Sequence, residues 1–82
     1  MTYTQITMTP EKTSTREISE LKFIELLAQI IALIKAGEDI EFTRVYSDDF
    51  RHLYRYEMVR NIKGRTVTTH FIPSDTEAAW AD

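Results

Sequence analysis

The chain has no cysteine and only two glycines, two prolines and two histidines among its 82 residues. The absence of cysteine excludes disulfide bonds and thiolate metal sites, and it agrees with a reducing compartment. Two histidines, His52 and His70, are too few for a structural zinc site. The small number of glycines and prolines, together with 43% hydrophobic residues, argues against disorder. We therefore expect a folded domain that binds no metal and no cofactor.

Long hydrophobic runs are also absent. The main apolar segment, residues 23–34, is shorter than the about 20 residues that a membrane-spanning helix needs. Residues 1–12 lack the charged and apolar regions of a secretory signal peptide. We expect a soluble, cytoplasmic protein that does not contact a membrane, folded as a single domain over residues 1–82. A domain of this size has a marginal core, so a partner subunit would stabilise it.

The apolar segment 23–34, FIELLAQIIALI, is the most informative feature that is present. A capping box at Ser14 and Glu17 precedes it, and Gly37 follows it as a residue that favours a helix end. These patterns predict one long helix over about residues 15–36.

This helix carries more apolar surface than one small sheet can cover. Its apolar residues occupy about half the circumference or more, whereas a helix that packs on a sheet needs a stripe of about 100°. The predicted core combines one helix face with strand residues: Phe23, Leu27, Ile30, Ile34, Phe42, Tyr56 and Phe71. The predicted homodimer interface is made by the other apolar positions: Leu21, Ile24, Ala28 and Ile31. The alternative is that the two termini of the chain cover these positions.

Alternating and turn-forming residues predict three antiparallel strands after the helix, over residues 40–46, 50–60 and 65–72. A two-residue turn at Lys63-Gly64 would join the last two strands and place Tyr56 opposite Phe71. The predicted fold class is α+β, with one long helix packed on this three-stranded meander.

The two ends of the chain are less well defined by their sequence. Residues 1–13 are expected to be either flexible or an edge strand, since threonine and tyrosine favour strands. A second capping box, Ser74 to Glu77, predicts a short C-terminal helical turn that places Trp80 on the core or offers it to a partner.

Basic residues alternate with aromatic residues after position 50, a pattern that sheets binding single-stranded nucleic acid use. However, Tyr54 and Tyr56 have the opposite strand parity to Arg55, so the rings and this cation should lie on different faces. The net charge of −3 also argues against a general nucleic-acid binder. Binding of single-stranded nucleic acid by the basic hairpin 51–65 is therefore kept as the alternative function.

An enzymatic function finds little support. His70 and Glu57 could exchange protons across the predicted sheet, but no nucleophile or cleft accompanies them. Asp48 and Asp49 lack the spacing of a calcium-binding loop.

The composition and patterns together predict a non-enzymatic protein–protein interaction module, a homodimer that acts as an adaptor or as an inhibitor of a larger protein or nucleoprotein. Phage-encoded host-takeover and anti-defence proteins often share this profile of a short, cysteine-free chain without catalytic residues. The predicted partner-binding residues are Arg51, Arg55, Arg60, Lys63, Arg65 and Trp80.

Overall fold

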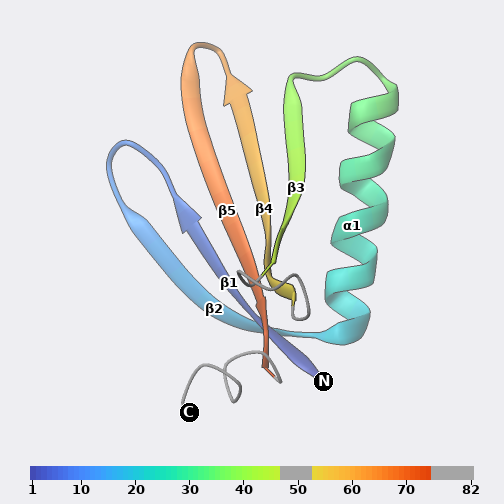
Figure 1. Ribbon diagram of the computed structural model, residues 1–82. Coiled ribbons are helices and arrows are strands. Elements are labelled where there is room, and N and C mark those ends of the chain that lie inside the picture. Colours follow the sequence, from blue (N-terminus) through green and yellow to red (C-terminus); the bar gives the residue numbers. More distant parts are fainter. Residues whose placement is uncertain (47–52, 75–82) are drawn as a thin grey trace.

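The computed structural model describes residues 1–46 and 53–74 (Figure 1). The elements of this part of the chain are β1 (Thr2–Met8), β2 (Thr13–Ser19), α1 (Glu20–Lys35), β3 (Ile40–Tyr46), β4 (Leu53–Ile62) and β5 (Arg65–Pro73). The strands form one antiparallel sheet in the order β2-β1-β5-β4-β3, and α1 lies to one side of it (Figure 1).

The predicted three-stranded meander is wrong, because the described residues form a five-stranded sheet. β3, β4 and β5 do form a meander, but β1 and β2 extend it on the β5 side. The N-terminal segment is therefore neither flexible nor an edge strand. β1 lies inside the sheet, paired with β2 along one edge and with β5 along the other.

The predicted start of the helix is also wrong. Ser14 and Glu17 belong to β2, and α1 begins only at Glu20, where Ser19 is the N-cap. The hydroxyl of Ser19 accepts a hydrogen bond from the backbone N–H of Lys22 at 3.1 Å. Residues 13–19 are a strand because their backbone groups pair with all seven residues of β1. This ladder satisfies more backbone groups than one extra turn of helix would.

The end of the helix follows the prediction. Gly37 has φ of 92°, in the left-handed region that glycine adopts without strain. The backbone N–H of Gly37 donates to the carbonyl of Ile34 and that of Glu38 donates to the carbonyl of Leu33, each at 3.1 Å. These two bonds satisfy carbonyls that would otherwise lack partners at the helix end.

The β4–β5 hairpin has the predicted turn and register. Lys63 and Gly64 both have positive φ, 50° and 79°, as a two-residue type I′ turn requires. Tyr56 pairs with Phe71 and Met58 pairs with Thr69, which confirms the predicted register.

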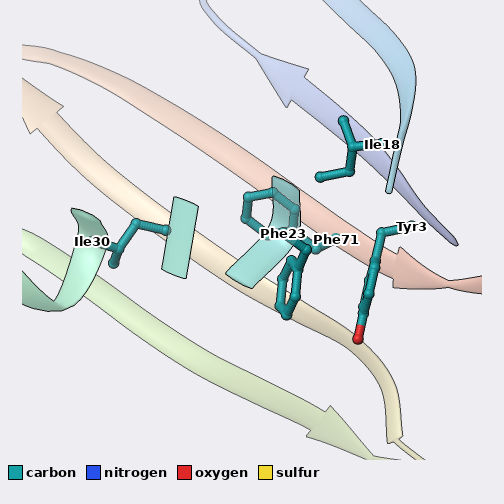
Figure 2. Packing of buried hydrophobic residues seen from close by; sticks show 5 residues of the cluster. All are labelled: Tyr3, Ile18, Phe23, Ile30 and Phe71. Atoms are coloured by element: carbon teal, nitrogen blue, oxygen red, sulfur yellow. The ribbon is translucent and has the colours of Figure 1, made fainter. Parts of the chain in front are cut away.

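The core lies between α1 and the sheet and centres on Phe23 (Figure 2). The ring of Phe23 stacks on that of Tyr3, with centroids 4.0 Å apart, and meets that of Phe71 edge-on at 5.3 Å. The buried hydrophobic residues shown in Figure 2 are Tyr3, Ile18, Phe23, Ile30 and Phe71.

The predicted core is partly confirmed. Phe23, Ile30 and Phe71 are buried, and Leu27, Phe42 and Tyr56 are partly buried against them. Ile34 is 39% exposed, so its assignment to the core is wrong. Two core residues were not predicted, Tyr3 and Ile18, because both belong to the strands that the sequence did not reveal.

Four predictions fall outside the described residues: the C-terminal helical turn, the placement of Trp80, that of Arg51, and the first part, residues 50–52, of the strand predicted over 50–60. Within the described ranges, no helix is both long enough and apolar enough to cross a membrane.

Candidate interaction surface

The outer side of α1 carries a stripe of apolar residues that the sheet does not cover. Leu21, Ile24, Ala28 and Ile31 follow one another at intervals of three and four positions, so they align along one side of the helix. All four are exposed. The exposed fractions of Leu21, Ile24 and Ile31 are 68%, 53% and 45%. We call these four residues the outer stripe.

The outer stripe has a polar border and an apolar border. On the side away from the core, Lys22, Glu25 and Gln29 are exposed and follow the same periodicity. Towards the core, the half-exposed Ile34 continues the apolar surface. Single exposed apolar residues are normal on protein surfaces, but a contiguous group of large ones marks an interaction site.

A second uncovered surface is the sheet face that points away from α1, here called the open face. None of the elements in the described ranges lies over it (Figure 1). Ile6 and Glu57 are the direct neighbours of His70 in the sheet, one on each side. All three residues are partly buried, since neighbouring side chains cover one another.

The predicted His70–Glu57 pair is therefore present on the open face. A guanidinium nitrogen of Arg55, Nη2, lies 3.8 Å from Oε2 of Glu57, so the glutamate also faces a cation. Nε of Arg55 and Nδ1 of His70 are buried and have no hydrogen-bond partner among the described residues. Proton transfer by this pair would need a substrate held beside His70.

Of the predicted partner-binding cations, those that the structure describes do not form one surface. Arg55 lies on the open face, whereas Arg60 has the strand parity of Met58, which packs on the core side. Arg65 pairs with Ile62, which has that same parity, and its guanidinium forms an ion pair with Glu11. Lys63 lies in the turn of the β4–β5 hairpin, so the described basic residues divide between the two faces and the tip.

The open face was missed at the sequence level because only three strands were expected. The alternation in β1 was a usable indication, since Thr4, Ile6 and Met8 share one parity and all three are partly buried. The outer stripe, in contrast, is made of the residues predicted for it, and the structure leaves them uncovered.

No family model, no curated protein and no solved structure matches this chain. The two uncovered surfaces are thus the physical basis for proposing a function.

Proposed function

We propose that the protein is a non-enzymatic protein–protein interaction module that works as a homodimer and acts as an adaptor or an inhibitor of a larger protein. The observation that supports this proposal is the outer stripe of α1, on which Leu21, Ile24 and Ile31 are among the large hydrophobic residues exposed to water. Water is a poor environment for these side chains, and a second copy of the same surface would remove them from it.

The size of the stripe indicates a weak dimer. Complete burial of one leucine or isoleucine side chain contributes about 1.5–3 kcal/mol. Because Leu21, Ile24 and Ile31 are already about half covered, six such side chains in a dimer gain on the order of 5–9 kcal/mol. The loss of translational and rotational freedom opposes association by about 4–15 kcal/mol. Even the favourable ends of both ranges leave a net gain of only about 5 kcal/mol, so we expect a dissociation constant of about 0.2 mM or weaker.

The alternative, binding of single-stranded nucleic acid by the hairpin 51–65, has less support. A nucleic-acid groove needs cations that follow one backbone, and here Arg55 lies on the face opposite to Arg60 and Arg65. The net charge of −3 would also repel phosphates at a distance.

Sedimentation equilibrium over a wide range of concentrations tests the dimer. The wild-type mass should rise from 9.6 kDa towards twice that value as the concentration increases into the high micromolar range. Ile31→Glu should remain at the monomer mass, because it places a charge in an apolar contact that occurs twice in the symmetric dimer.

Gln29→Glu is the matched control, since it introduces the same charge on the same helix but on the polar border. It should dimerise like the wild type, and circular dichroism should show both variants to be folded. A wild-type chain that stays monomeric at every concentration would exclude the homodimer.

A separate experiment addresses the alternative function. Arg60→Glu combined with Lys63→Glu should leave oligonucleotide binding unchanged, at a dissociation constant no tighter than about 10⁻⁴ M at physiological salt. Tight binding of a single-stranded oligonucleotide that weakens steeply with salt, and that this double variant abolishes, would favour nucleic-acid binding instead.

A further inference from the structure

The outer stripe has an internal symmetry. Leu21 and Ile31 lie five positions before and after Leu26, and Ile24 and Ala28 lie two positions before and after it. A two-fold interface requires that when residue i of one copy meets residue j of the other, residue j also meets residue i. The stripe satisfies this requirement if two helices run antiparallel with the two-fold axis at the level of Leu26.

We propose that two copies of α1 associate antiparallel through the outer stripe, with the symmetry axis crossing the stripe at the level of Leu26, whose own side chain packs on the core, an inference that rests on the proposed homodimer. In this arrangement Leu21 of one copy packs against Ile31 of the other, and Ile24 packs against Ala28. The small side chain of Ala28 leaves room for the larger Ile24, so the two surfaces interdigitate and the helix axes approach to about 8–10 Å.

The charges at the two ends of α1 are complementary in this arrangement. Glu20 lies in the first turn, Lys35 lies in the last turn, and both are exposed. At about 100° per residue, both project from the same side of the helix as the outer stripe. In the antiparallel pair, Glu20 lies about 4.5 Å along the axis from Lys35 of the other copy. Two symmetric ion pairs then close the ends of the interface.

A parallel pair would have the opposite electrostatics. Glu20 would face Glu20, Lys35 would face Lys35, and the two helix dipoles would point in the same direction. Ala28 would also face Ala28, which leaves a gap between the helices beside the bulky contact of Ile24 with Ile24. Both the charges and the side-chain sizes therefore favour the antiparallel pair.

Cysteine cross-linking tests the direction of the helices, because the natural chain contains no cysteine. Leu21→Cys and Ile31→Cys are prepared separately, with a mass tag on one of them, and oxidised alone and as an equimolar mixture. A disulfide forms only where the two Cα atoms come within about 4.4–6.8 Å. We expect the mixture to form the tagged–untagged dimer at least about tenfold faster than either variant forms a dimer with itself.

The pair Ile24→Cys and Ala28→Cys gives a second, independent test near the centre of the stripe. Gln29→Cys, on the polar border, is the control for random collisions and should cross-link slowly in every combination. Sedimentation under reducing conditions first gives the dissociation constant of each variant, and the cross-linking rates are compared at concentrations that give equal fractions of dimer.

The possible outcomes separate the two proposals. Rapid cross-linking of each variant with itself would show a parallel pair, and a dimer without any cross-link at these four positions would show a different interface. Either result overturns the antiparallel arrangement and leaves the homodimer standing. A wild-type chain that remains monomeric overturns both.

Charge reversal adds a measurement that does not involve cysteine. Glu20→Lys and Lys35→Glu should each weaken the dimer about three- to tenfold, since each replaces two attractive contacts by repulsive ones. The double variant should restore the wild-type dissociation constant, because the pairs are re-formed with reversed signs. Failure of the double variant to recover, while both single variants weaken the dimer, would contradict the antiparallel arrangement.

Discussion

The inner and outer sides of α1 carry the same kinds of residue and have opposite environments. Phe23 and Ile30 point to the sheet and are 4% and 7% exposed, whereas Leu21 and Ile24 are 68% and 53% exposed. What differs is the surface opposite each side. The sheet lies against the inner side only, so, within residues 1–46 and 53–74, the outer side is left to water or to another chain (Figure 1).

This difference shows that the apolar residues of one helix can contribute to two separate equilibria, the folding of the single chain and the association of two chains. Residues on the inner side contribute to the free energy of unfolding, because folding removes them from water. Residues on the outer stripe contribute less to folding of the single chain, because about half of their surface stays in water, and the exposed part is removed from water only when two chains meet. Substitutions on the two sides should therefore change different measured quantities.

The largest effect is expected at the centre of the core. Phe23→Ala should lower the free energy of unfolding by about 3–5 kcal/mol, because it removes a ring that contacts those of Tyr3, Tyr56 and Phe71. Urea unfolding followed by circular dichroism measures this change. A loss below about 1 kcal/mol would mean that the inner side of the helix is not the one that packs on the sheet.

Two adjacent isoleucines give the sharpest contrast. Ile30→Ala should lower the free energy of unfolding by about 2–4 kcal/mol, because Ile30 is buried. Ile31→Ala should change it by less than about 0.5 kcal/mol at concentrations where the chain is monomeric, since Ile31 is 45% exposed. Equal losses at the two positions would contradict the difference between the inner side and the outer stripe.

The start of the helix determines whether Leu21 belongs to the outer stripe at all. Ser19→Ala should destabilise the fold by about 1 kcal/mol, because the hydroxyl of Ser19 caps the backbone N–H of Lys22. Ser14→Ala should have a much smaller effect, since Ser14 lies exposed in β2. Thermal unfolding of the two variants distinguishes them, and a larger loss for Ser14→Ala would instead support a helix that begins near residue 15.

The smallest effect on stability is expected at a polar contact that does not involve the helix. Arg65→Ala removes the ion pair with Glu11, in which both side chains are more than half exposed. The free energy of unfolding should change by less than about 0.5 kcal/mol, and still less at high salt. A change as large as that of Ile30→Ala would show that surface charges, and not the buried side of α1, dominate the stability.

Local patterns predicted the parts of the fold that depend on neighbouring residues. Lys63 and Gly64 identified the turn between β4 and β5, and with it the register that places Tyr56 opposite Phe71. Gly37 identified the end of the helix. In each case one or two residues favour a positive φ, and only a few kinds of turn and helix end require it.

The missed elements depend on pairing between distant residues. The capping box of Ser14 and Glu17 is a local pattern that predicts a helix. The chain forms the β1–β2 ladder there instead, and this ladder pairs residues up to 17 positions apart. The position of β1 beside β5 has no local pattern at all. The core residues Tyr3 and Ile18 were missed for this reason, while the outer stripe was predictable because it depends on helix periodicity alone.

The candidate surfaces also differ in how far local sequence patterns could predict them. Helix periodicity was sufficient to select Leu21, Ile24, Ala28 and Ile31, and their role in a dimer stays a prediction. The basic residues needed more information, because their division between two faces depends on the strand register and on the turn at Lys63-Gly64. The open face could not be predicted without knowing that β1 joins the sheet.

The position of β1 between β2 and β5 has a consequence for how the chain folds during synthesis. At about 5–20 residues per second, the ribosome makes β5 on the order of 3–12 s after β1. β2 can pair with β1 early, because only a short loop separates them. The other edge of β1, with the sequence TYTQITM, then stays unpaired. It contains neither lysine nor proline, the residues that commonly protect strand edges from other chains. Of the five described strands, β1 is made first and gains its second partner last, so its open edge is available to other nascent chains during that interval.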